Sequence, residues 1–169
     1  MEKTKVICIK CGLANVFILK GRKTILVDSG LRGSTDKILK ELKKNGIDKS
    51  DVSLILLTHV HPDHCLNTRH LKEALGVPVA VNSREAGYLA AGEFSPVVPI
   101  NLTGKILLWS LKSIHEKHTD VVKADITFDE ELSLDEYGIE GKAIVIPGHS
   151  LGSTVIFLDD RSCLGIVEI

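Results

Sequence analysis

Residues 58–64 combine three histidines and one aspartate in the sequence Thr-His-Val-His-Pro-Asp-His. They follow an aliphatic run at residues 52–57, which predicts a buried strand because it is short and contains no breaker. Pro62 cannot donate a backbone hydrogen bond, so we expect the polar cluster in the loop that leaves this strand. Neutral imidazoles and a carboxylate suit zinc, iron or manganese. The alternative is a histidine-rich surface loop, which clustering disfavours because three of the chain's seven histidines gather here.

A second polar loop contains one histidine, His149. This loop, residues 147–153, also comes directly after an aliphatic segment that reads as a strand. Two loops at strand ends of one sandwich can meet at the edge of the sheets. Three imidazoles would then surround one metal, those of His59, His61 and His149. Asp63 and His64 would face a second metal or the attacking water.

Other residues of ligand type have simpler interpretations. Cys8 and Cys11 have the spacing of a zinc knuckle, but no second pair answers them, and positions i and i+3 of a strand point to opposite faces. Cys65 follows the histidine cluster and could face the metal, although a packed thiol is the preferred interpretation. His115 and His118 could chelate from one side of a predicted helix, but the charged residues around them indicate a solvated helix edge.

Hydrophobic periodicity and turn residues outline an alternation of strands and helices. Helices are predicted from Ser34 or Thr35 to about residue 45, over 68–75 with Asn67 as the cap, to about residue 91 from a capping box formed by Asn82 and Glu85, and over 105–118. Strands are predicted over residues 5–9, 15–19, 24–27, 52–57, 77–81, 126–128, 132–134, 142–146 and 154–158, with a final apolar run at 163–169.

Composition narrows the class of protein. The chain has 169 residues with 44% apolar side chains, which predicts one domain, residues 1–169, with a substantial aliphatic core. The net charge is −1 and no basic run exceeds Lys43-Lys44, so no nucleic-acid partner is expected. No apolar stretch approaches the ~20 residues of a spanning helix, and no signal-peptide core is present. We therefore expect no membrane association and a cytoplasmic location.

Four segments resemble motifs of the metallo-β-lactamase superfamily. Residues 58–64 match its T-H-x-H-x-D-H signature, and residues 147–153 resemble its P-G-H-[ST]-x-G-S loop. Residues 25–30, ending in Asp28-Ser29-Gly30, resemble its first motif, and residues 15–18 are similar to an early strand. The resemblance implies a four-layer αββα sandwich, with His59, His61 and His149 as ligands of a first metal and Asp63 and His64 as ligands of a second. It also implies that Asp28 supports the ligand loops without binding metal.

The chain departs from this family pattern near its end. The family places an aspartate that bridges the two metals beyond the third motif, and the corresponding window here contains Glu168 as its only carboxylate. A final histidine ligand of the second site is absent, because the chain stops at Ile169. We therefore expect a C-terminally short sandwich whose second metal site is weaker than the first. An uncovered apolar edge at residues 163–169 would favour a homodimer.

The residues permit hydrolysis. A metal held by three imidazoles would keep an open position and lower the pKa of its bound water, so that a hydroxide is available near neutral pH. Asp63 can orient this hydroxide and take a proton. The sequence thus predicts a hydrolase with one or two zinc ions, iron or manganese being alternatives, that cleaves a small-molecule ester, thioester or amide, as glyoxalase II-like enzymes do. A phosphodiesterase ranks second, since no cluster of Arg and Lys offers a phosphate clamp. An impaired or truncated member that only binds a ligand or partner is the third interpretation.

Overall fold

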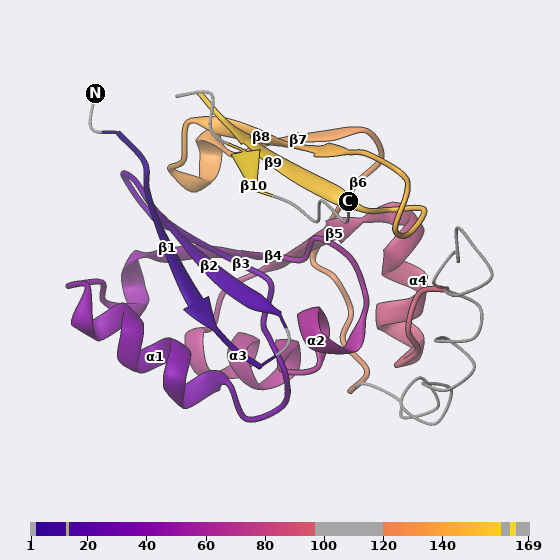
Figure 1. Ribbon diagram of the computed structural model, residues 1–169, viewed down its shortest axis with the longest axis horizontal. Coiled ribbons are helices and arrows are strands. Elements are labelled where there is room, and N and C mark those ends of the chain that lie inside the picture. Colours follow the sequence, from indigo (N-terminus) through magenta and orange to yellow (C-terminus); the bar gives the residue numbers. More distant parts are fainter. Residues whose placement is uncertain (1–2, 13, 97–119, 160–162, 165–169) are drawn as a thin grey trace.

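The computed structural model of the protein describes residues 3–12, 14–96, 120–159 and 163–164. These residues form two sheets and a set of short helices (Figure 1). The first sheet has six strands in the order β1 to β6, and the second has four strands in the order β10-β9-β8-β7. The strands are β1 Lys5–Lys10, β2 Asn15–Lys20, β3 Thr24–Val27, β4 Val52–Leu56, β5 Val79–Asn82, β6 Ile126–Phe128, β7 Glu131–Ser133, β8 Gly141–Val145, β9 Thr154–Leu158 and β10 Cys163–Leu164.

The six-stranded sheet is mixed. Strands β1, β2 and β3 pair antiparallel, whereas β3, β4, β5 and β6 pair parallel. Helices connect the parallel strands, as a parallel crossover requires. Every residue of β3 is buried, because both faces of this central strand are covered.

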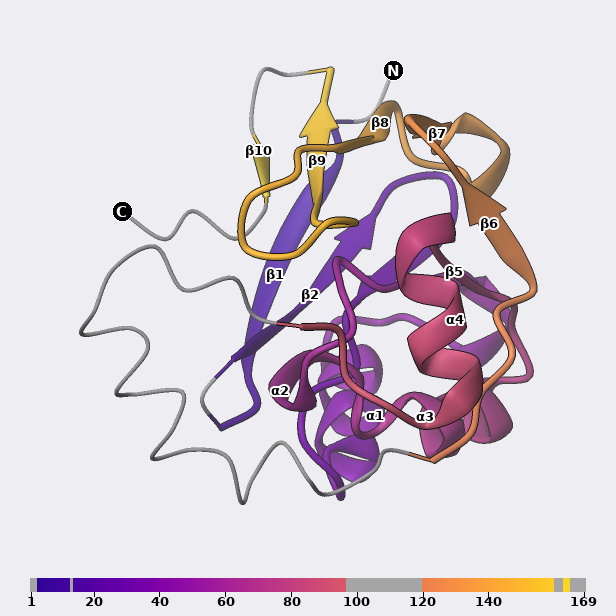
Figure 2. The same ribbon diagram turned by 90° about the vertical axis from the view of Figure 1, so that its right-hand side faces the viewer.

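Helices cover one face of the six-stranded sheet. They are α1 Thr35–Lys44, α2 Pro62–Cys65, α3 Thr68–Leu75 and α4 Ser83–Ala91. Single turns of 3-10 helix precede β4 at Lys49–Asp51 and join β7 to β8 at Asp135–Tyr137. Helix α1 buries Ile38 and Leu42 and exposes its charged side chains, so its amphipathic pattern explains which way it faces. Figure 2 shows α4 beside the β5–β6 side of the sheet.

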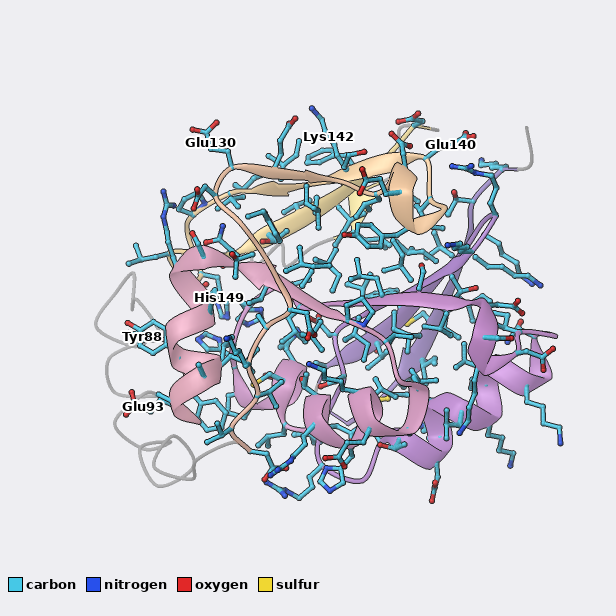
Figure 3. The ribbon with its side chains drawn as sticks, turned by 180° about the vertical axis from the view of Figure 1, so that it is seen from behind. Tyr88, Glu93, Glu130, Glu140, Lys142 and His149 are labelled. Carbon is cyan, nitrogen blue, oxygen red and sulfur yellow. The ribbon has the colours of Figure 1, made fainter. Side chains whose placement is uncertain are left out.

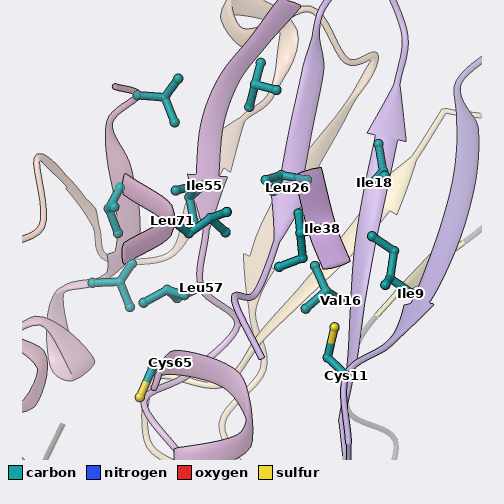
Figure 4. Packing of buried hydrophobic residues seen from close by; sticks show 14 of the residues in the cluster. Ile9, Cys11, Val16, Ile18, Leu26, Ile38, Ile55, Leu57, Cys65 and Leu71 are labelled. Carbon is teal, nitrogen blue, oxygen red and sulfur yellow. The ribbon is translucent and has the colours of Figure 1, made fainter. Parts of the chain in front are cut away.

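Two aliphatic clusters lie on opposite faces of the six-stranded sheet. Alternate residues of β3 and β4 point to opposite sides, as in any strand. Leu26 and Ile55 pack under the helices, in the cluster drawn in Figure 4. Ile25 and Leu54 pack toward the four-stranded sheet. The core is therefore mainly aliphatic, as the low aromatic content predicts, and Phe128 is a buried aromatic member of the cluster between the sheets.

The described residues supply three of the four expected layers: helices, mixed sheet and antiparallel sheet (Figure 1). This arrangement agrees with the predicted sandwich of two sheets covered by helices. No described helix lies on the outer face of the four-stranded sheet, where the Phe157 side chain is exposed. The division of the chain into domains stays a prediction.

Most predicted elements are confirmed within one or two residues, but two local interpretations are wrong. The stretch around Pro62 is a single helical turn, α2, and not a loop. A proline lacking its N–H is tolerated at the first helical position, where that N–H has no partner within the helix. Glu85 also does not form the expected capping box: the Asn82 side chain accepts from the Arg84 N–H, but the Glu85 carboxylate bonds elsewhere. The predicted helix at 105–118 lies outside the described residues.

In the described part of the chain, no helix is long and apolar enough to cross a membrane.

Candidate metal centre

The ends of neighbouring strands bring the polar loops together. Asp28 directly follows β3, and Thr58 lies two residues beyond β4, so the parallel pairing places them side by side. The backbone N–H of Asp28 donates to the Leu56 carbonyl at 2.8 Å. From the other sheet, the backbone N–H of Thr154 donates to the Thr58 carbonyl at 3.0 Å. Both sheets therefore hold the start of the histidine cluster.

The structure gathers the three predicted imidazoles at one point. One ligand atom from each of His59, His61 and His149 lies within 4.8 Å of the other two. The ring centroids of His59 and His61 are 4.4 Å apart, and those of His61 and His149 are 4.6 Å apart. Figure 3 shows His149 beside helix α4. Residues separated by 88 positions in the sequence, His61 and His149, thus share one site.

His59 points an unprotonated nitrogen into this cluster. The Thr58 hydroxyl donates its only proton to the Asp28 carboxylate at 3.0 Å, so its oxygen accepts from His59 Nδ1–H, also at 3.0 Å. Nε2 is then left with a lone pair. This atom is buried and has no hydrogen-bond partner among the described residues. Burial and the neighbouring imidazoles lower the pKa of His59 well below the usual histidine range, which keeps the ring neutral.

His61 presents its other nitrogen. Its Nε2 lies 3.1 Å from the Ser95 carbonyl oxygen, which can only accept, so Nε2 carries the proton. Its Nδ1 lies 2.8 Å from Nε2 of His149. The backbone at Ser95 is itself held by a bond from its N–H to the Val60 carbonyl at 2.9 Å. The segment after α4 therefore selects which nitrogen of His61 faces the site.

Asp28 connects the two halves of the histidine cluster. Its carboxylate accepts the Thr58 N–H at 2.8 Å and faces His64 Nδ1 at 2.7 Å. Among the described non-glycine residues it alone has a positive φ, 64°, a conformation that aspartate tolerates better than most residues. A strained backbone held by several bonds is typical of a functional site. These contacts are those expected of a residue that supports the ligand loops, and the absence of metal binding by Asp28 stays a prediction.

Asp63 and His64 lie on α2, beside the imidazole cluster. The ring centroid of His64 is 4.2 Å from that of His59, and its Nε2 is 3.7 Å from an Asp63 oxygen. Burial lowers the pKa of His64, but the charge and hydrogen bond of Asp28 and the charge of Asp63 outweigh it and raise the pKa overall. The two residues form a second group of ligand type next to the first, and their assignment as ligands stays a prediction.

The residues of the first group fit a divalent metal. All three side chains are imidazoles, the ring of His59 is neutral, and its buried lone pair at Nε2 has no partner in the described part of the chain. Buried acceptors without partners are rare in proteins, and an ion that satisfies one explains it. Metal-bound histidines also commonly donate their other N–H to a neighbouring oxygen, as His59 and His61 do here.

Sequence reasoning missed Glu85. This residue of α4 is only 1% exposed, and its carboxylate accepts bonds from both histidine-bearing loops. A glutamate three residues after an N-cap has the pattern of a capping box, and that pattern hid its role. The hydroxyl of Ser150 and the small residue Gly152 in the second loop were the sequence features related to this role of Glu85, because these two residues contact its carboxylate.

The remaining candidate ligands are cysteines that do not belong to the imidazole cluster, or residues outside the described part of the chain. Cys65 is buried in the aliphatic core under the helices, as expected for a packed thiol. Cys11 is buried in the same cluster, whereas Cys8 is exposed. His115, His118 and Glu168 lie outside the described residues.

Comparisons with known proteins agree with this geometry. A sequence profile described as the metallo-beta-lactamase superfamily matches residues 9–164. A probable metallo-hydrolase of Methanocaldococcus jannaschii is 29% identical over 153 residues, which are 90% of this chain and 66% of that protein. A probable metallo-hydrolase of Bacillus subtilis is 28% identical, over 90% of this chain and 59% of its own length. The chain thus spans roughly three fifths of these relatives.

Solved structures show the same fold. A metallo-beta-lactamase of Cronobacter sakazakii superposes with a TM-score of 0.67 at 22% identity, covering 88% of this chain and 53% of that one. A subclass B3 metallo-beta-lactamase of Bradyrhizobium japonicum gives a TM-score of 0.64 at 25% identity, with the same coverage. Because the superfamily profile covers most of its length, this chain belongs to the metallo-beta-lactamase superfamily.

Proposed function

We propose that this protein is a metal-dependent hydrolase that cleaves an ester, thioester or amide bond of a small molecule. The observation that carries the proposal is the convergence of His59, His61 and His149, where the buried lone pair of His59 Nε2 has no partner among the residues that the structure describes. The relatives described as probable metallo-hydrolases support the reaction class but name no substrate.

The three imidazoles would hold the metal, and we propose zinc because neutral histidines in a three-ligand set suit it best. When bound, zinc supplies Lewis acidity and activates a water molecule near neutral pH. Asp63 is the chain's own proton acceptor in this proposal. Its half-buried carboxylate lies beside His64, on the same turn of helix, where it can orient the attacking water.

The electrostatics of the site support neutral or modestly charged substrates. The described ring cluster is flanked by two aspartates, Asp28 and Asp63, and by a buried glutamate, Glu85. A phosphodiester would bring further negative charge to this end of the molecule. We therefore rank esters, thioesters and amides above phosphodiesters.

The test is metal content followed by turnover. Purified protein, stripped with a chelator and reloaded with Zn²⁺, Mn²⁺ or Fe²⁺, should retain at least one metal ion per chain by mass spectrometry. It should then hydrolyse a generic thioester or aryl ester faster than a bis-aryl phosphodiester. Faster phosphodiester cleavage would favour the second interpretation, and metal retention without any turnover would favour a binding protein.

Two histidine substitutions make this test specific. His59→Ala should abolish uptake of the first metal equivalent, because it removes the imidazole at the centre of the cluster. His70→Ala is the matched control, since His70 is half exposed on α3, where it lies 3.7 Å from the Asp120 carboxylate. Metal uptake that survives His59→Ala would show that the ligand assignment is wrong.

A further inference from the structure

Glu85 is a buried carboxylate outside the set of candidate ligands. It lies in the first turn of α4 with 1% of its surface exposed. A carboxylate taken out of water is costly unless hydrogen bonds or an opposite charge compensate it. The partners of Glu85 therefore indicate what this residue is for.

Those partners belong to the two loops that carry the candidate ligands. Glu85 Oε2 accepts the backbone N–H of Val60 at 2.9 Å, and Val60 lies between His59 and His61. Glu85 Oε1 accepts the Ser150 hydroxyl at 2.8 Å and the Gly152 N–H at 3.0 Å. One oxygen thus holds the first histidine loop, and the other holds the loop of His149.

The second loop is arranged around this carboxylate. The backbone N–H of Ser150 donates to Ser153 Oγ at 2.8 Å, and the two hydroxyls lie 3.0 Å apart. Because the Ser150 hydroxyl gives its proton to Glu85, the Ser153 hydroxyl donates to Ser150. The residue following His149 is therefore linked to Glu85 through its side chain and fixed from behind by Ser153.

Steric contact at Gly152 shows that the fit is close. A Cβ atom at Gly152 would lie 2.5 Å from Glu85 Cγ and 3.0 Å from Glu85 Oε1. Such distances are far below van der Waals contact, so only glycine lets the loop backbone approach the carboxylate. This contact explains why residue 152 is a glycine, without any requirement from its backbone torsion angles.

We propose that Glu85 is a positioning residue that holds the two histidine loops in register, so that His149 meets His59 and His61 at one metal. It acts through its hydrogen bonds to Val60, Ser150 and Gly152, which lie next to the ligand histidines in the two loops. This inference rests on the three-imidazole metal site of the proposed function. It does not depend on the identity of the substrate or on whether the protein catalyses hydrolysis.

The principal test is Glu85→Gln, which keeps the shape but removes one acceptor. In either orientation the amide NH₂ would face a backbone N–H, of Val60 or of Gly152, because Oε2 serves one loop and Oε1 the other. The less disruptive orientation sacrifices the Val60 bond and loosens the loop between the first two histidines. We expect Zn²⁺ affinity, measured by competition with a chromophoric chelator, to fall about 10- to 100-fold, as for other residues that orient metal ligands.

The control and a second readout separate positioning from general stability. Glu73→Gln makes the same substitution at an exposed site on α3, where Glu73 pairs with Arg69, and should leave Zn²⁺ affinity within twofold. Affinity is measured well below the melting temperature of each variant, on protein shown to be folded by circular dichroism. The Co²⁺-loaded Glu85→Gln protein should also show a changed visible absorption spectrum, which a merely less stable protein with an intact site would not show.

A second variant keeps the proposal testable if Glu85→Gln does not fold. Ser150→Ala removes one of the three bonds to Glu85 and should lower Zn²⁺ affinity by a smaller factor in a folded protein. In a double variant the two losses should be less than multiplicative, because both act through the same carboxylate. The proposal is overturned if folded Glu85→Gln, or folded Ser150→Ala where the first variant fails to fold, binds Zn²⁺ as tightly as the wild type with an unchanged Co²⁺ spectrum. Since these assays measure metal alone, they are unaffected if the predicted hydrolysis is not found.

Discussion

Replacing Thr58 by valine tests the chain of contacts that orients His59. Valine has nearly the shape of threonine but no hydroxyl. The substitution removes the bond from the hydroxyl to Asp28 and leaves His59 Nδ1–H without its acceptor, both at 3.0 Å in the present structure. The backbone bond from Thr58 N–H to Asp28 is retained, so the loop should keep its course.

The structure sets the size of the effect. His59 is fully buried, so an orphaned Nδ1–H costs about 1–3 kcal/mol of unfolding free energy in the metal-free protein. Moving the proton to Nε2 exchanges one orphaned atom for another and occupies the lone pair that faces the site. Either state weakens the metal site. We expect Zn²⁺ affinity to fall about 10- to 100-fold, which corresponds to about 1.4–2.8 kcal/mol.

The assay compares Thr58→Val with Thr58→Ser, which retains the hydroxyl. Zn²⁺ dissociation constants come from chelator competition, and unfolding free energies come from urea titration of the metal-free proteins. The serine variant should resemble the wild type in metal affinity, because its hydroxyl can still link Asp28 to His59.

Two results would refute this reasoning. One is a valine variant that binds Zn²⁺ within twofold of the wild type, since the hydroxyl would then have no part in orienting His59. The other is a serine variant as weak as the valine variant, since the methyl group would then explain the loss.

Three further predictions concern stability and assembly. Asp28→Asn should lower the unfolding free energy by about 2–4 kcal/mol in urea titration. Both oxygens of the buried carboxylate accept hydrogen bonds, whereas an amide has only one oxygen that can accept. A loss below about 0.5 kcal/mol would contradict this reasoning. Burial raises the pKa of Asp125. The hydrogen bonds from Lys72 and from the Val79 N–H, together with the Lys72 charge, outweigh burial, so the pKa lies below its usual 3.8. Asp125 therefore stabilises the fold above that pH and loses this contribution as the pH falls through its lowered pKa. The cost of Asp125→Asn, about 0.2–1 kcal/mol at pH 7 for an exposed pair, should vanish in acid, and an equal cost at pH 3 and pH 7 would contradict the assignment. A homodimer through the edge of β10 is expected by light scattering, and a monomer across the micromolar range would oppose it.

Much of the fold follows from local sequence. The aliphatic runs that become β3 and β4 are short and unbroken, and the alternation of Ile38 and Leu42 with charged residues specifies the buried face of α1. Local patterns were weaker where two structures share one signal. A proline after the histidine pair suits a loop or the first turn of a helix, and the backbone of α2 adopts the second.

The candidate site divides in the same way. The types and spacing of the residues in 58–64 and around His149 were sufficient to predict that three imidazoles share one metal site and which chemistry that site permits. Which nitrogen of His59 and of His61 faces the centre was not readable from the sequence. It depends on the Thr58 hydroxyl and the Ser95 carbonyl, and the latter comes from a segment beyond α4.

The amino-acid sequence by itself determined the ligand types, the strands that carry them and the family to which the chain belongs, because these depend on residue identity and short-range spacing. Only the tertiary structure decided how the two loops are held together. A buried carboxylate must find its donors wherever the fold places them, and Glu85 finds them in two loops that lie 25 and 65–67 residues away in the chain. Such long-range partners leave no periodic signal, so the register of the metal centre appears only when both sheets and α4 are in place.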